Sequence, residues 1–100
     1  MAFQIKEQHG IFKVIGNISS QNVNSLENYV SAHLHKTNHL ILSNENVDQL
    51  DRSGAFMLER LYKVFVKKNR IISIIGNQNK KIANIMALTK TNYILSSDRI

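Results

Sequence analysis

Residues 47–58 read Val-Asp-Gln-Leu-Asp-Arg-Ser-Gly-Ala-Phe-Met-Leu and lead from a strand into a helix. The apolar run before them, residues 39–42, is typical of a strand that is covered on both faces. After them, apolar residues recur every three or four positions, which predicts an amphipathic helix over 53–68. Asp51 is well placed to cap that helix by accepting from amides two or three residues later. Gly54 would let a backbone or a partner come close to the first turn.

The same kind of pattern predicts the rest of the chain, because a period of two residues indicates strands and a period near 3.6 indicates helices. The predicted elements are a strand at 3–6, a turn at 8–10, a strand at 12–15, a helix at 20–36 whose first turn uses the hydroxyl of Ser19 or Ser20, the strand at 39–42, an extended polar loop at 43–51, the helix at 53–68, a strand at 71–75, a helix at 79–89 and a last strand at 93–95. The side chains expected to face inward from the last two helices are Ala55, Leu58, Leu61, Tyr62, Phe65, Val66, Ile82, Ile85, Met86 and Thr89.

This order predicts an α/β fold, with a mixed, mostly parallel sheet of four to five strands and three or more helices packed against it. The opening hairpin should place an antiparallel strand at one edge. With 100 residues, 43% of them hydrophobic, we expect one domain over 1–100. No apolar run is long enough to cross a membrane, and residues 1–10 lack the core of a signal peptide, so we expect a cytoplasmic protein.

Nothing in the sequence supports catalysis or a bound cofactor. The chain has no cysteine, which excludes disulfides, thiolate metal sites and cysteine nucleophiles. His33 and His35 are two positions apart on the predicted helix, so they point in different directions and cannot share a metal ion. Asp48 and Asp51 lie in a polar loop and do not form a pair suited to acid–base chemistry. We therefore predict no catalytic, metal or cofactor residues.

The net charge of +6 is distributed unevenly along the chain. Residues 1–51 carry a net charge of −2, and residues 52–100 carry +8. Such an asymmetry is typical of a surface that meets an acidic partner, but it does not by itself indicate nucleic-acid binding.

Several segments, in order, resemble the STAS domain, the family of anti-sigma factor antagonists and of cytoplasmic modules attached to anion transporters. Residues 16–26, Gly-Asn-Ile-Ser-Ser-Gln-Asn-Val-Asn-Ser-Leu, follow the family stretch G-x-L-D-x-x-N-A-x-x-L. Residues 40–43 and 47–54 follow its strand, loop and D-S-x-G helix start. Residues 72–76 and 88–91 resemble its later strand and third-helix region. The resemblance implies a protein-binding module of bacterial sigma-factor regulation that acts by partner switching.

The departures from the family pattern concern the switch itself. In members with a phosphoswitch, the serine directly after the aspartate accepts a phosphate from a partner kinase, and Arg52 occupies that position here. Ser53 keeps a hydroxyl one position later and is a possible phosphoacceptor. The aspartates of the first loop and of the third strand are replaced by Ser19 and Ser43. A phosphoserine brings about −2 charge, whereas Arg52 fixes +1, so we favour a module without the usual switch or without its usual partner.

The leading hypothesis is a non-enzymatic module that docks on a kinase-type anti-sigma factor and so releases the sigma factor, as the resemblance implies. The docking surface would be the loop at 43–52, the helix start up to 56 and the nearby edge at 19–22. Arg52 would anchor it electrostatically, and Ala55 and Phe56 would add apolar contact if they face outward; core packing is the alternative for Phe56. The residues expected to bind the partner are Ser19, Asn22, Asp51, Arg52, Ser53, Gly54 and Phe56.

Two other functions stay open. The chain is also similar to small single STAS chains that serve as cytoplasmic accessory subunits of ABC-type lipid or solute transporters. A basic nucleic-acid binder is the other alternative, less favoured because aromatic stacking platforms and a recognition-helix pattern are missing. Its phosphate contacts would be Lys67, Lys68, Arg70, Lys80 and Lys81.

Overall fold

The computed structural model describes residues 3–34 and 36–96. Its elements are β1 (Phe3–Gln8), β2 (Ile11–Ile18), α1 (Val23–Ser31), β3 (His39–Leu50), α2 (Arg52–Lys67), β4 (Ile71–Ile75), α3 (Lys80–Leu88) and a 3₁₀ helix at Asn92–Ile94. The four strands form one sheet in the order β1-β2-β3-β4, in which β1 and β2 are antiparallel and the other pairs are parallel. The mixed, mostly parallel α/β sheet expected from the sequence is confirmed.

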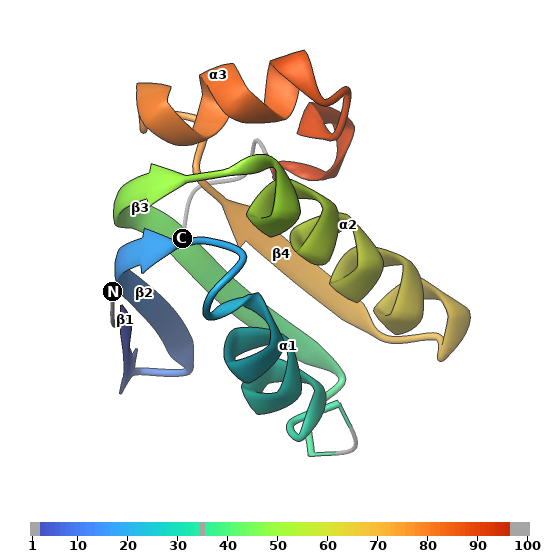
Figure 1. Cartoon of the computed structure of the whole chain (residues 1–100). Helices are drawn as coiled ribbons and strands as arrows, with labels where there is room; N and C mark the ends of the chain where they lie inside the picture. Colours follow the sequence, from blue (N-terminus) through green and yellow to red (C-terminus); the bar gives the residue numbers. More distant parts are fainter. Residues whose placement is uncertain (1–2, 35, 97–100) are drawn as a thin grey trace.

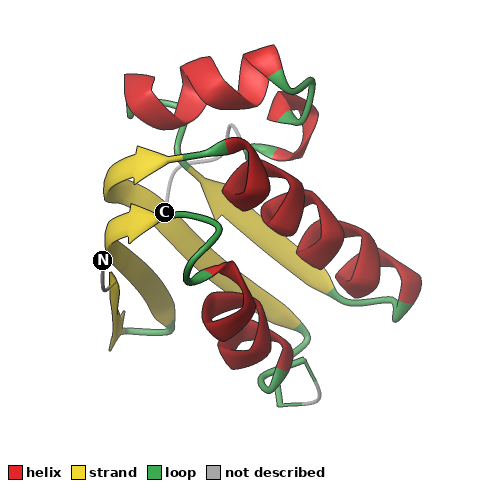
Figure 2. Cartoon of the chain, viewed as in Figure 1, coloured by secondary structure: helices red, strands yellow, loops and turns green. Residues whose placement is uncertain are grey.

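The helices are divided between one face and one end of the sheet. α1 and α2 lie side by side over the same face, and α3 crosses near the end where β3 stops and α2 begins (Figures 1 and 2). An ion pair joins α1 to α2, because Arg60 donates from Nε and Nη2 to the two carboxylate oxygens of Glu27 at 3.1 and 2.9 Å. The hydrogen bond to Glu27 raises the pKa of Arg60 above its ordinary value.

The hairpin between β1 and β2 is as expected at the sheet edge. Its two-residue turn uses His9 and Gly10, with φ of 53° and 81°. A turn with two left-handed residues matches the twist of paired strands, which is why glycine suits the second position. β2 is longer than the predicted 12–15 because its pairing continues along β3 as far as Ile18.

The core lies between the sheet and the three helices. Its fully buried side chains include Val14, Leu26, Leu42, Leu58, Leu61, Phe65, Ile74, Ile82 and Met86. Of the inward set expected on α2, Val66 is wrong, since 53% of it is exposed. It follows Phe65 by one helical step of 100°, which carries it out of the buried stripe. On α3, Ile85 and Thr89 lie at the boundary of the core.

The predicted polar loop at 43–51 is wrong, because β3 continues to Leu50. β3 contributes one extra residue relative to β2 at two places, between the partners of Lys13 and Ile15 and again between those of Gly16 and Asn17. These bulges re-aim the strand, so that Val47 and Leu50 are buried while Asp48 and Gln49 are exposed. Side-chain polarity therefore did not reveal backbone pairing in this segment.

The predicted strand at 93–95 is also wrong. Residues 92–94 form a 3₁₀ helix, and only a single bridge joins Leu95 to Ile74, with the amide of Ser96 donating to the carbonyl of Ile74 at 2.7 Å. The 3₁₀ turn buries Ile94 and leaves Tyr93 exposed. The Tyr93 hydroxyl donates to Glu59 of α2, and this hydrogen bond raises the pKa of Tyr93.

Two helices are shorter than predicted. α1 covers Val23–Ser31 instead of 20–36, and α3 covers Lys80–Leu88 instead of 79–89. A turn at 19–22 precedes α1, in which the amides of Asn22 and Val23 both donate to the carbonyl of Ser19. The Ser19 hydroxyl accepts from the amide of Gln21 at 3.3 Å, so it serves this turn and not the first turn of the helix.

Asn44 is a polar residue in the core. Its side chain is 0% exposed, and within the described residues neither its oxygen nor its nitrogen has a hydrogen-bond partner. It lies beside Gly76: a Cβ added at Gly76 would be 3.7 Å from Cβ of Asn44 and 3.0 Å from Cγ2 of Ile82. An unsatisfied buried amide costs about 1–3 kcal/mol, so Asn44 lowers the stability of the fold.

We predict that Asn44→Leu raises the free energy of unfolding by about 1–3 kcal/mol, because leucine has nearly the same shape and no polar atoms to desolvate. Urea unfolding followed by circular dichroism measures the change. Asn46→Leu is the control, since Asn46 is exposed on the same strand and its replacement should change stability by less than about 0.5 kcal/mol. A loss of stability in Asn44→Leu would contradict this account of Asn44.

Candidate functional site

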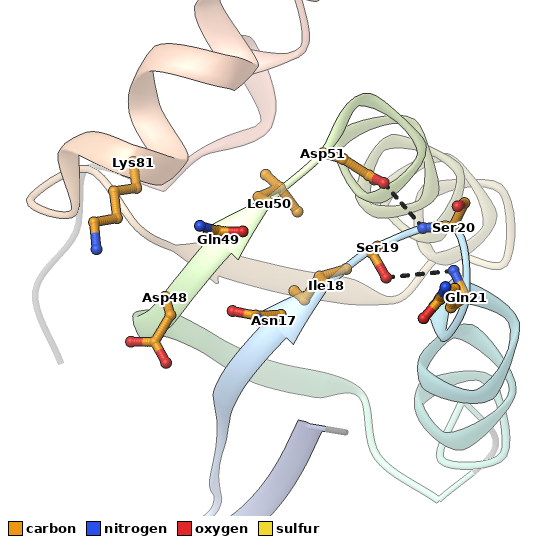
Figure 3. A pocket seen from close by; sticks show the side chains of 10 residues that line it. All are labelled: Asn17, Ile18, Ser19, Ser20, Gln21, Asp48, Gln49, Leu50, Asp51 and Lys81. Carbon is orange, nitrogen blue, oxygen red and sulfur yellow. Dashed lines mark hydrogen bonds between the residues drawn. The ribbon is translucent and has the colours of Figure 1, made fainter. Parts of the chain in front are cut away.

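The carboxyl ends of β2 and β3 lie next to each other and form the floor of an open groove. The groove has a volume of about 660 Å³ and is lined by residues 17–21, residues 48–51 and Lys81 (Figure 3). Four parts of the chain contribute: the end of β2, the turn at 19–22 that precedes α1, the end of β3 with Asp51, and the first turn of α3. This is the end of a parallel sheet at which α/β proteins commonly place their binding sites.

Asp51 closes the groove on the side of α2. Its Oδ1 accepts from the amide of Gly54 at 2.9 Å, which confirms the predicted helix cap. Its Oδ2 accepts from the amide of Ser20 at 3.0 Å. Asp51 therefore serves the start of α2 and the turn before α1 at the same time, and Figure 3 shows the bond to Ser20 across the groove wall.

Asn22 holds the turn at 19–22 in its shape. Its oxygen accepts from the amide of Ser19 at 2.9 Å, and its nitrogen donates to the carbonyl of Asn17 at 2.8 Å. Asn22 is only 8% exposed. Its side chain thus shapes the surface from below, while Ser19 and Ser20 lie on the groove itself.

Gly54 is where α2 approaches the sheet most closely. A Cβ added there would lie 2.8 Å from Cγ2 of Ile18 and would collide with Cδ1 of Leu50. The close approach that the sequence suggested is therefore made by the chain's own strand ends. Ala55 is fully buried, so it does not face outward.

Arg52 and Phe56 are the exposed members of the set that the sequence indicated on α2. Phe56 is 42% exposed, which excludes the alternative that it packs in the core. Arg52, the first residue of α2, is exposed and forms no ion pair or hydrogen bond with the described residues. Ser53 is half-buried beside it. An unpaired cation and an aromatic ring thus lie one helical turn apart at the start of α2.

Comparison with protein-family models identifies the family of this chain. The family model described as the STAS domain matches residues 1–96. This chain belongs to the STAS domain family. A search of curated protein sequences finds no relative of it.

Solved structures share the fold of this STAS domain at low sequence identity. An anti-sigma factor antagonist from Mycobacterium paratuberculosis matches with a TM-score of 0.76 and 16% identity, covering 94% of this chain and 81% of that one. The unphosphorylated anti-sigma factor antagonist SpoIIAA matches with a TM-score of 0.75 and 11% identity, covering 98% and 89%. An uncharacterised protein with a SpoIIAA-like fold from Shewanella loihica PV-4 matches with a TM-score of 0.53 and 16% identity, covering 97% and 80%.

Metal binding and membrane spanning find no support in the part of the STAS domain that the structure describes. No group of three or more His, Cys, Asp or Glu residues among residues 3–34 and 36–96 could hold a metal ion. The ring of His33 bonds to the carbonyl of Tyr29, and that of His39 bonds to Ser73. His35, the other histidine considered for a metal site, lies outside the described residues. Within those residues, no helix has the length and apolar character needed to span a membrane.

Sequence reasoning missed part of the groove. Asn17 and Lys81 line it but lay outside the surface that was expected to dock on a protein. Gln49 and Asp48 were assigned to a loop, which hid the fact that they sit on a strand end beside β2. Lys81 comes from α3, about 30 positions further along, and no local pattern relates it to Asp48. The order of the strands, together with the resemblance, was the signal that could have found them.

We predict that Gly54→Ala lowers the free energy of unfolding by about 1 kcal/mol. Overpacking against Ile18 and Leu50 costs about 1–3 kcal/mol, and the better helix propensity of alanine returns up to about 1 kcal/mol. Urea unfolding followed by circular dichroism measures the change. Arg52→Ala, at an exposed position of the same turn, should alter stability by less than about 0.5 kcal/mol. Equal stability of Gly54→Ala and the wild type would show that the first turn of α2 has room to move.

Proposed function

We propose that this STAS domain is a non-enzymatic regulatory module that docks on a kinase-type anti-sigma factor and thereby releases the sigma factor. The observation that carries the proposal is the exposed, unpaired Arg52 one helical turn before the exposed Phe56 at the start of α2, which follows the groove residue Asp51. Arginine and aromatic residues are enriched where proteins bind one another. The fold shared with two anti-sigma factor antagonists supports the choice of partner.

The docking face, as we define it, comprises residues 19–21, residues 48–53 and Phe56. Its centre is the groove; Lys81 borders the face from α3, and Arg52 directly follows the groove residue Asp51 in sequence. The buried residues Asn22 and Gly54 support this face without touching the partner. We expect Phe56 to fill an apolar pocket of the partner and Arg52 to meet a carboxylate.

The charge at the start of α2 is fixed in this chain. Arg52 stands where members with a phosphoswitch carry their phosphoserine, so phosphorylation cannot reverse the charge at that position. A phosphate on Ser53 would lie beside Arg52 and the free amides of the helix start, which favour an anion. Ser53 is thus the position at which a switch could operate. Without phosphorylation there, docking is constitutive.

The arrangement of the basic residues disfavours the nucleic-acid alternative. Lys67 ends α2 and Lys68 and Arg70 follow it, whereas Lys80 and Lys81 begin α3. The two regions lie at opposite ends of the molecule (Figure 1). These residues therefore do not form the single clustered patch that is the usual electrostatic footprint of nucleic-acid binding.

We predict that Arg52→Glu weakens binding to the kinase-type anti-sigma factor by about tenfold or more, because it places a negative charge against an acidic partner surface. Isothermal titration calorimetry with the purified proteins measures the affinity. Lys67→Glu is the matched control, with the same charge change at the other end of α2, and should bind like the wild type. Equal loss of affinity in both variants would show that net charge matters and that this surface does not.

An affinity pull-down from the native organism tests the identity of the partner. With the wild-type chain as bait and Arg52→Glu as the negative control, we expect mass spectrometry to recover a kinase-type anti-sigma factor only with the wild type. Recovery of a permease and its ATPase instead would favour the transporter accessory subunit. The same spectra should be searched for phosphate on Ser53, whose absence under all growth conditions would exclude a switch at that position.

A further inference from the structure

The docking face is assembled from two segments that are far apart in the sequence. Residues 19–21 precede α1, whereas Arg52 and Phe56 belong to the first two turns of α2. A partner that contacts both segments requires them to keep a fixed distance. The structure therefore has to hold the turn at 19–22 against the start of α2.

One carboxylate bridges the two segments. Oδ2 of Asp51 accepts from the amide of Ser20 at 3.0 Å, across 31 positions of sequence, while Oδ1 accepts from the amide of Gly54 at 2.9 Å. The backbone of Asp51 is engaged as well, since its amide donates to the carbonyl of Ile18 at 3.1 Å and its carbonyl accepts from the amide of Ala55 at 3.1 Å. These other bonds already fix Asp51 to β2 and α2, so the bond from Ser20 to its second oxygen is an additional contact.

The bond to Ser20 is more than a helix cap needs. An N-cap requires one acceptor oxygen, which asparagine or serine supplies as well as aspartate does. Two amide donors approach two different atoms of this side chain, and among these three residue types only the carboxylate has a separate acceptor oxygen for each. Within the turn, by contrast, the bonds from Ser19 to Asn22 and from Gln21 to Ser19 are local. They set the shape of the turn but do not join it to Asp51.

We propose that Asp51 is a positioning residue, whose second oxygen holds residues 19–21 against the start of α2 so that the docking face meets its partner already ordered. The effect on partner binding rests on the proposed function, but the tether itself does not. Preorganisation of this kind raises affinity because less conformational entropy is lost on binding. Asp51 thus shapes the docking face from its edge, and its charge is not required to contact the partner.

Asp51→Asn separates the tether from the cap. The amide has a single acceptor oxygen, which the adjacent Gly54 amide retains, and its NH₂ group then faces the Ser20 amide donor to donor. We expect the exchange rate of the Ser20 amide proton, measured by NMR, to rise about tenfold while that of Gly54 stays near the wild-type value. Asp51→Ser, which also keeps a cap, should behave in the same way and serves if the first variant folds poorly. An unchanged Ser20 exchange rate in the folded variant would overturn the proposal.

Asp48→Asn is the matched control, because it removes the same charge from the same groove. Asp48 is exposed and has no hydrogen bond or ion pair with the described residues, so its replacement should leave the Ser20 exchange rate unchanged. A rise in Asp48→Asn equal to that in Asp51→Asn would overturn the tether in favour of a general charge effect.

A second measurement, titration with the purified kinase-type anti-sigma factor, tests the consequence for docking. We expect Asp51→Asn to lose about tenfold in affinity at an unchanged urea midpoint. Full affinity with a released Ser20 amide would overturn the positioning role. If the wild type itself does not bind this partner, the proposed function fails, while the exchange measurement still decides whether Asp51 holds the turn.

Discussion

The rest of the structure depends on the close approach of α2 to the ends of β2 and β3. At Gly54 the helix backbone rests on Ile18 and Leu50 with no room for a side chain. This approach fixes where α2 starts, and the parallel pairing of β2 with β3 fixes where the turn at 19–22 begins. Because both segments leave the sheet from adjacent strand ends, they form one surface although Ser20 and Asp51 are 31 positions apart in the sequence. Strand order thus sets the floor of the groove, and the turn at 19–22 and the start of α3 complete its lining.

Much of this fold could be predicted from the sequence, for a physical reason that also explains the failures. Side-chain periodicity reports burial, and burial follows the 3.6-residue and two-residue periods wherever an element is regular, as in α2 and β4. Periodicity fails to predict a strand where backbone pairing continues but the alternation of buried and exposed side chains is broken. In β3 two bulges break the alternation, so a paired strand from Ser43 to Leu50 resembles a polar loop. Near the end of the described chain, Ile94 is buried by a 3₁₀ turn, which its apolar character could not distinguish from a strand.

In the candidate site, too, some features follow from the local sequence and others depend on contacts between distant segments. Its chemistry, a capped helix start with an exposed arginine, lies within residues 51–56 and follows from local pattern. Which side chains face outward depends on tertiary contact instead. Asn22 is buried because its amide group holds its own turn, and Ala55 is buried because Gly54 brings the first turn onto the sheet. Lys81 reaches the groove only because α3 crosses the end of β3, a placement that no local pattern encodes.

The charge at position 52 is unfavourable to the helix that carries it, and the docking that we propose would offset this. The start of a helix carries a partial positive charge, so a cation in the first turn is unfavourable by about 0.3–1 kcal/mol and an anion would be favourable. α2 has no acidic residue in its first turn, and Arg52 forms no bond with the described residues that would offset this cost. Asp51 already supplies the cap and its negative charge, so the helix gains nothing further from Arg52. In the proposed docking, a carboxylate of the partner would offset this cost.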